Sequence, residues 1–362
     1  MLFHAGASIF LGGFLGVDVF FVISGYLITN MIVFQRSQNT FAFLAFYQRR
    51  IRRIIPALLL VMLFSIPLAY CFMQPGELEN FGQSLISTTF MANNILLYLT
   101  SGYWDLASEF KPLLHTWSLG VEEQYYIIFP LLIAVIYKLS AIRLNYALYF
   151  LTLMSFLFFM YMQNIDRDAA FYLLPSRFWE IGMGASTSIF LIQNQRHHLL
   201  PLHRDACLFF GLLCIFLPML AFNIFKIIPG LANVFVCLGT VIIIVLANQA
   251  SILGRILRMR FLVLVGLMSY SLYLWHQPLL AFLRIMSLEK PNSLSLILCF
   301  FLTFPVAFLS WKFENFFRNT ASSQFFVSFV TIGILISLIA GTIFVKTSGF
   351  YKHYPELQST YS

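Results

Sequence analysis

Charged residues are scarce in this sequence, and their scarcity excludes a soluble globular protein. Only 10% of the 362 residues are charged, 60% are hydrophobic, and the mean hydropathy is +0.84. A soluble domain of this length needs more polar surface to cover its core. Apolar runs long enough to cross a bilayer recur along the chain instead. The sequence therefore predicts an all-α integral membrane protein.

Several motifs are also absent, and each absence removes a class of site. The five cysteines form no CxxC pair and no His/Cys cluster with metal-ligand spacing, so we predict neither a disulfide nor a metal site. There is no GxxxxGK[ST] loop, GxSxG elbow or HExxH pair, and we expect no tightly bound cofactor. The net charge of +8 is explained by basic cytoplasmic loops, so we expect no nucleic-acid partner.

The apolar segments predict about ten core transmembrane helices and one extra C-terminal span. Residues 1–7 lack the basic region of a signal peptide and read as the end of a truncated first helix. The other segments, each of roughly 20 residues, fall at about 15–34, 54–72, 117–137, 144–162, 178–195, 205–223, 231–248, 261–282, 293–312 and 326–345.

The segment 81–99 is apolar but carries Gln83, Asn93 and Asn94. If it does not cross, most of the Lys and Arg residues share one side, which is then the cytoplasm. We therefore expect 76–115 to be an external excursion and 346–362 to be an extracytoplasmic tail.

On this topology, ionisable groups from several helices lie at one level near the outer face. They are His4, Asp18, Glu122 with Glu123, Arg177 with Glu180, and His276. A charge inside a membrane is costly unless it is paired or faces water. Asp18 therefore either caps its helix at the headgroup boundary or belongs to a buried polar site.

A histidine beside a carboxylate is the arrangement that activates a hydroxyl by general-base catalysis. His4 near Glu122 or Asp18 would act in this way. A lone membrane histidine more often makes one hydrogen bond between helices. We assign that packing role to His115, and for His276 both the packing role and a role at the site stay open.

Four arginines occur within five residues, in FYQRRIRRIIPALLL, at the predicted cytoplasmic face. They either anchor the orientation against anionic lipids or bind a phosphate-rich ligand, because guanidinium groups bind phosphate bidentately. Arg50 and Arg53 share one helix face, as do Arg49 and Arg52, and periodicity does not choose between the pairs.

Six blocks in order resemble the membrane-bound acyltransferase 3 family. They are HAG, GGFLGVDVFFVISGYLIT, RRIRRIIPALLL, PLLHTWSLGVEEQYYIIFPLL, RFWEIGMGA and SYSLYLWHQPLL. The resemblance covers about residues 1–320 and is strongest to the branch that O-acetylates bacterial surface polysaccharides such as lipopolysaccharide O-antigen.

This resemblance implies roles for individual residues. His4 matches the essential histidine of the family, although the arginine that precedes it in the family would fall before Met1. Arg50 and Arg53 match the RxxR motif implicated in acyl-CoA use. Glu122, rather than Glu123, matches the glutamate of the WSL-x-x-E block.

The resemblance also implies how the chain is divided. Residues 1–320 form the acyltransferase 3 transmembrane domain, 326–345 an additional helix, and 346–362 the tail. In WKFENFFR, Glu314 is kept and Phe316 replaces the usual proline. Members with an extra span and an external tail carry a fused SGNH domain, which we expect here to be separate or missing.

We therefore predict a multi-pass O-acyltransferase of the bacterial cytoplasmic (inner) membrane. It would transfer an acyl group, expected to be acetyl, from cytoplasmic acyl-CoA to a hydroxyl of an envelope glycan, free or lipid-linked, among membrane lipids. His4, Glu122 and Asp18 would form the catalytic site. Residues expected around the acceptor or behind this site are Trp117, Glu123, Arg177, Glu180 and His276. The alternatives are a transporter of an envelope precursor and a non-catalytic scaffold.

Overall fold

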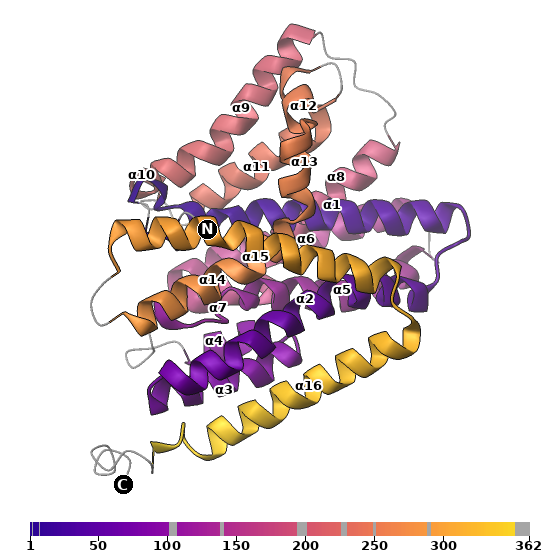
Figure 1. Ribbon diagram of the computed structural model, residues 1–362. Helices are drawn as coiled ribbons and strands as arrows, with labels where there is room; N and C mark the ends of the chain where they lie inside the picture. Colours follow the sequence, from indigo (N-terminus) through magenta and orange to yellow (C-terminus); the bar gives the residue numbers. More distant parts are fainter. Residues whose placement is uncertain are drawn as a thin grey trace. The chain divides into compact units, whose positions relative to one another are not determined.

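The computed structural model of the protein describes residues 1, 3–6, 8–100, 107–137, 141–193, 201–225, 230–248, 251–287 and 291–351 (Figure 1). Within these ranges the chain forms helices joined by turns and loops, and no strand. The predicted all-helical class is confirmed. The structure divides into two compact units, which are described separately: unit 1 contains residues 1–6, 44–120 and 267–362, and unit 2 contains residues 7–43 and 121–266.

Unit 1 is built from helices of the first third and the last quarter of the chain. Its helices are α2 (Phe43–Phe72), α3 (Pro75–Thr89), α4 (Asn93–Thr100), α14 (Ser269–Met286), α15 (Ser293–Asn319) and α16 (Ser323–Lys346), with the short 3-10 helix η3 (Ser108–Phe110). In this unit α14 packs against α15, and α3 packs against α16 (Figure 1). The segment predicted as an additional C-terminal span is α16, so this helix is part of unit 1.

Unit 2 contains the remaining helices. They are α1 (Gly16–Ser37), α6 (Ala141–Ile165), α7 (Arg167–Tyr172), α8 (Leu174–Gln193), α9 (Pro201–Leu220), α10 (Phe222–Phe225), α11 (Leu231–Leu246) and α12 (Ile252–Leu257). Three limits between the units fall within helices: after Phe43 at the start of α2, within α5 (Thr116–Tyr137) and within α13 (Arg260–Leu267). In unit 2, α8 packs against both α1 and α6, and α9 packs against α11.

Small residues let α1 and α8 approach closely. A Cβ atom added at Gly184 would lie 1.9 Å from the carbonyl oxygen of Val22, and one added at Gly25 would lie 1.9 Å from that of Ile181. Such contacts are possible only for glycine, and small residues of this kind mark close helix pairs in membranes. The α1–α8 pair therefore depends on these two positions.

Six helices in the described ranges are long and apolar enough to cross a membrane, judged by length and composition. They lie within Gly13–Ser37, Phe43–Phe72, Leu144–Ile165, His203–Leu220, Ser293–Asn319 and Ser323–Lys346. Each predicted span overlaps a helix of the structure, which supports a multi-pass membrane protein. The count of ten core spans stays a prediction.

Three predicted boundaries differ from the structure. Helix α2 begins at Phe43, so the arginine block lies inside the helix and not in a loop before it. The span predicted at 261–282 is divided at Met268 into α13 and α14, beside Gly266 and Ser269, which have lower helix propensity than the aliphatic residues around them. Residues 3–6 form a turn instead of a helix end, and Gly6 has a φ of +79° there.

The segment 81–99, which is apolar but carries polar residues, forms two helices with a break between them. Helix α3 ends at Thr89, Met91 has a φ of 54°, and α4 starts at Asn93. The buried Asn93 side chain accepts a hydrogen bond from Ser87 and donates to the carbonyl of Leu113, which satisfies its amide. The polar residues that set this segment apart in the sequence therefore fix a break between two helices. Its predicted position outside the membrane stays a prediction.

Candidate active site

Three histidines come together in unit 1. The ring centroids of His4 and His276 lie 5.3 Å apart, and those of His115 and His276 lie 5.5 Å apart. His115 and His276 are each 2% exposed, and His4 is half-buried. We call these three residues the histidine cluster. The sequence assigns His115 only to packing, whereas the structure places it beside the two candidate functional histidines.

A hydrogen bond sets the tautomer of His276. Its Nδ1 lies 2.6 Å from the carbonyl oxygen of Tyr273. Because a carbonyl oxygen can only accept, Nδ1 carries the hydrogen in this bond. In the neutral ring, Nε2 is then the nitrogen with the free lone pair, so it is the atom of His276 that can accept a proton.

Helix α14 holds the segment that carries His115. The Tyr273 hydroxyl donates to the carbonyl of His115 at 2.5 Å and lies 2.6 Å from the Ser118 hydroxyl. The Gln277 amide donates to the carbonyls of Ser108 and Lys111 at 3.3 and 3.1 Å. Side chains spaced three and four residues apart lie on one helix face. One face of α14 therefore organises residues 108–118 around the histidine cluster.

His115 lies outside the helices, directly before α5. Burial, and secondarily the nearby His4, lower the pKa of His115 to about 3. Its imidazole is therefore neutral at physiological pH. Trp117, which follows it closely, is also buried.

A second polar group, the carboxylate cluster, lies in unit 2 and joins three helices. Asp18 of α1 and Glu180 of α8 flank the Arg177 guanidinium, whose Nη1 lies 3.2 Å from Asp18 Oδ1 and 2.5 Å from Glu180 Oε1. The Asn233 amide of α11 donates to Asp18 Oδ2 at 2.7 Å. Asp18, Arg177 and Glu180 are at most 2% exposed. Of the two readings of Asp18, the structure favours the buried polar site over a helix cap.

Glu122 is buried in the part of α5 that belongs to unit 2. It accepts hydrogen bonds from the hydroxyls of Ser24 on α1 and Tyr126 on α5 itself. Glu123, its neighbour, is half-buried. The hypothesis that Glu122 or Asp18 orients His4 connects residues of two different units, and it stays a prediction.

The structure distinguishes the arginines that periodicity could not. The Arg52 guanidinium donates to the carbonyls of Phe317 and Ala321 at 2.9 and 3.2 Å, and to the Ser323 hydroxyl at 3.1 Å. Arg52 is thus occupied in holding the turn between α15 and α16. Arg53 is exposed and Arg50 half-buried, with its guanidinium 5.9 Å from the Phe46 ring. The structure thus sets Arg52 apart from the other arginines, and the assignment of Arg50 and Arg53 to a ligand stays a prediction.

Glu314, the acid kept in the late block, lies near this pair. It is 3% exposed and interacts electrostatically with Arg53 and Arg318, the latter through a 3.9 Å contact between Nη1 and Oε1. The Glu314 carboxylate offsets the positive charge of these two arginines. The late block of the sequence therefore lies in the same region of unit 1 as Arg53 of RRIRR.

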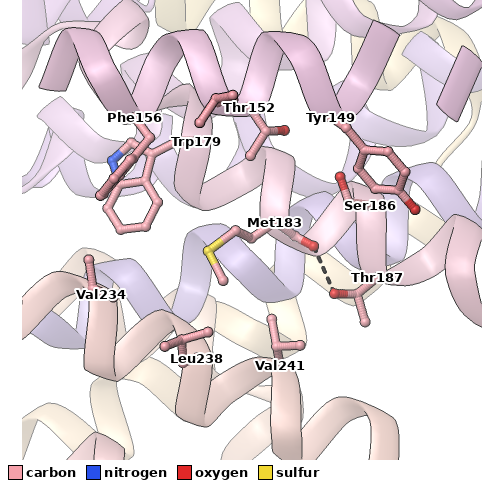
Figure 2. Close-up of a pocket in the computed structure, with 11 residues that line it drawn as sticks. Tyr149, Thr152, Phe156, Trp179, Met183, Ser186, Thr187, Val234, Leu238 and Val241 are labelled. Carbon is pink, nitrogen blue, oxygen red and sulfur yellow. Dashed lines mark hydrogen bonds between the residues drawn. The ribbon is translucent and has the colours of Figure 1, made fainter. Parts of the chain in front are cut away.

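Unit 2 also contains an apolar cavity of about 440 Å³ between α6, α8 and α11 (Figure 2). Figure 2 shows Trp179, Phe156 and Val234 at one end and Tyr149, Ser186 and Val241 at the other. No Asp, Glu, His, Lys or Arg lines it. The cavity is therefore lined by apolar and neutral side chains.

The structure brings the predicted residues together in three places. His4 meets His276, Asp18 meets Arg177 and Glu180, and Arg50 and Arg53 lie on one helix. No three His, Cys, Asp or Glu side chains in the described part of the chain come together in a way that could hold a metal ion.

Sequence reasoning missed His115 as a member of the histidine cluster, and it missed Tyr273 and Gln277 as the side chains that hold its segment. The spacing of Tyr273, His276 and Gln277 along one face of α14 could have revealed the last two.

Comparisons with known proteins identify the family. A family model described as an acyltransferase domain, of the acyltransferase 3 type, matches residues 1–312. The chain is 30% identical over 346 residues to the peptidoglycan O-acetyltransferase OatA of Listeria monocytogenes, covering 90% of this chain and 55% of that protein. It is 28% identical over 299 residues to the O-acetyltransferase OatA of Staphylococcus aureus, covering 78% of this chain and 49% of that protein.

A third relative, an uncharacterized protein of Haemophilus influenzae, is 32% identical over 252 residues, which are 65% of this chain and the whole of that protein. The chain thus spans about half the length of the OatA relatives. No solved structure matches it. Because the family model covers most of the chain, the protein belongs to the acyltransferase 3 family of membrane O-acyltransferases.

Proposed function

We propose that this protein transfers an acetyl group from cytoplasmic acetyl-CoA to a hydroxyl of a cell-envelope glycan beyond the membrane. The observation that carries the proposal is the histidine cluster, in a chain that belongs to an acyltransferase family. Acyl transfer to an alcohol needs a base that takes the hydroxyl proton as the oxygen attacks. Neutral imidazoles supply such a base near neutral pH.

In the proposed reaction, His4 accepts the proton of the acceptor hydroxyl. The hydroxyl oxygen attacks the thioester carbonyl, and a tetrahedral intermediate forms. Its collapse breaks the carbon–sulfur bond, and the CoA thiolate leaves and takes up the proton from the imidazolium. The ring of His276 lies beside those of His4 and His115, and its Nδ1 hydrogen is engaged with Tyr273.

The donor would bind at the arginine block. Acyl-CoA carries phosphates, and guanidinium groups bind phosphate in bidentate geometry. Arg50 and Arg53 are the candidates because Arg52 is engaged with the α15–α16 turn. Acyl-CoA is a co-substrate here and not a resident cofactor.

The carboxylate cluster would stabilise the packing of α1, α8 and α11 within unit 2. Asp18 and Glu180 compensate the buried charge of Arg177, and such pairs are costly to break inside a membrane. We propose that Glu122, through Ser24 and Tyr126, orders α1 and α5 in the same way. Trp117 and Glu123 remain candidates for contact with the acceptor.

The acceptor class has two candidates. One relative is a peptidoglycan O-acetyltransferase, whereas the sequence blocks are most similar to the branch that modifies surface polysaccharides such as the O-antigen. Both are hydroxyl-rich glycans outside the cytoplasmic membrane, and a lipid-linked precursor of either would be accessible. We also propose that the membrane is the inner membrane and that the tail after α16 is extracytoplasmic.

The test is the ester-linked acetate of purified peptidoglycan and of O-antigen from cells that depend on the full-length protein. Mild alkali releases this acetate for quantification. We expect His4→Ala and Arg53→Ala to lower it at least about tenfold in one of the two glycans, because each removes a required group. His203→Ala and Arg255→Ala are matched controls at exposed positions of unit 2.

The outcomes separate the alternatives. Loss of ester-linked acetate in both variants, at equal protein level and with normal controls, supports the proposed roles of His4 and Arg53. The glycan that loses its acetate is then the acceptor. Wild-type acetate in the His4→Ala cells contradicts the role of His4. An unchanged acetate content in cells without the protein contradicts the proposed function itself.

A further inference from the structure

The segment that carries His4 is held by an arginine of α14. Arg284 donates from Nη2 to the carbonyl oxygen of His4, and its Nε lies 3.5 Å from Glu109 Oε2. The Arg284 side chain is 10% exposed and that of Glu109 is 56% exposed. One guanidinium therefore links the backbone at His4 to the residues around η3.

His4 needs an anchor of this kind because no helix fixes it. Residues 3–6 form a turn closed by a hydrogen bond from the Gly6 amide to the Phe3 carbonyl. A turn leaves the direction of a side chain much less determined than a long helix does. The carbonyl of His4 is the point at which the neighbouring helix restrains it.

The same helix supplies both contacts of His4. His276 and Arg284 are eight residues apart on α14, which corresponds to about 12 Å along the helix axis. His276 contacts the ring of His4, and Arg284 contacts its backbone. Two contacts from one helix therefore restrain His4, one at its ring and one at its backbone.

The guanidinium is not fully satisfied by these contacts. Arg284 Nη1 is buried and has no hydrogen-bond partner within the described ranges. A buried donor left unpaired lowers stability. With Nη1 unpaired, Arg284 is better explained by its contact with the His4 carbonyl than by a contribution to the free energy of unfolding.

We propose that Arg284 is a positioning residue, which binds the carbonyl of His4 so that the imidazole stays beside His276. The inference rests on the proposed function of His4 as the base. Glu109 acts one step further away by orienting the guanidinium.

The experiment measures kcat and KM for acetyl-CoA with the full-length protein in proteoliposomes containing the acceptor glycan. We expect Arg284→Gln to lower kcat about 10- to 100-fold with KM unchanged, because misplacing a catalytic group by about 1 Å costs this much. Arg284→Lys keeps the charge and a donor and should recover a large part of kcat. Glu109→Gln should lower kcat less than Arg284→Gln does.

Arg255→Gln is the matched control. Arg255 is an exposed arginine of α12 in unit 2, outside both the histidine cluster and the arginine block. We expect its kcat to equal that of the wild type. If Arg284→Gln fails to fold, Arg284→Lys and Glu109→Gln decide the question by the same split between kcat and KM.

A kcat within twofold of the wild type in folded Arg284→Gln would overturn the proposal, as would a loss expressed only in KM. Failure of the proposed function would give a different result, because His4→Ala itself would then leave acetyl transfer intact.

Discussion

His276 and His115 show how much a single residue can be read from sequence. A histidine in an apolar helix has the same sequence pattern whether it packs or reacts. His276 could be named as a candidate because it lies at the level of other ionisable groups. His115 could not, because its place in the cluster depends on the bonds from Tyr273 and Gln277 to its segment. Contacts between distant segments leave no periodic signal.

In the arginine block, helix spacing alone does not show which pair of arginines is functional. Spacing shows that Arg50 and Arg53 share a face, but it shows the same for Arg49 and Arg52. The structure sets Arg52 apart, because carbonyls at the end of α15 and in the turn after it accept hydrogen bonds from its guanidinium. Carbonyls at a helix end need donors, yet the sequence does not show which donor reaches them.

The buried, neutral His115 makes the free energy of unfolding depend on pH. The unfolded chain binds a proton at His115 below about pH 6.5, whereas the folded protein does so only near pH 3. The free energy of unfolding should therefore fall as the pH drops from 6.5 towards 3, by up to about 1.4 kcal/mol per pH unit. Chemical denaturation in detergent at several pH values measures this slope.

His115→Gln should have a shallower slope than the wild type over this range, because it removes the titrating group. Equal slopes in the two proteins would show that His115 is protonated in the folded state as readily as in the unfolded chain.

At the scale of helices, hydropathy predicted most of the elements. Long apolar runs have one stable solution in a bilayer, because every backbone group must be bonded within the helix. The early start of α2 and the division into α13 and α14 could not be read in the same way. Charged residues within RRIRR masked the helix, and the hydropathy around Met268 gave no sign of a break.

The crossing of α1 and α8 carries a prediction at this scale. Gly184→Ala would place a methyl group against the carbonyl of Val22, so the two helices must move apart. We expect the free energy of unfolding to fall by about 1–3 kcal/mol, the usual cost of overpacking. The matched control is Gly266→Ala in α13, where an added Cβ meets nothing within 4 Å.

Thermal unfolding of both variants in detergent tests this prediction. Gly266→Ala should melt at or above the wild-type temperature, since alanine favours the helix over glycine. A Gly184→Ala variant as stable as Gly266→Ala would mean that α1 and α8 do not pack as closely as in the structure.

At the scale of the whole molecule, the sequence predicted the family, and the family model confirms it. The sequence predicted the residues of the histidine cluster and of the arginine block less completely. His4, His115 and His276 come from three segments far apart in the sequence, and they meet through the fold of unit 1. Six ordered blocks identify an acyltransferase, but only the structure shows which side chains in those blocks contact each other.

The central claim is that this protein transfers acetyl groups through His4. The most direct measurement is transfer of radiolabel from acetyl-CoA to envelope glycan by the full-length protein reconstituted in proteoliposomes, comparing the wild type with His4→Ala. The account predicts labelled glycan with the wild type and at least a hundredfold less with His4→Ala, in line with the contribution of a general base of about 10²–10⁴-fold. Equal labelling by the two proteins would contradict it.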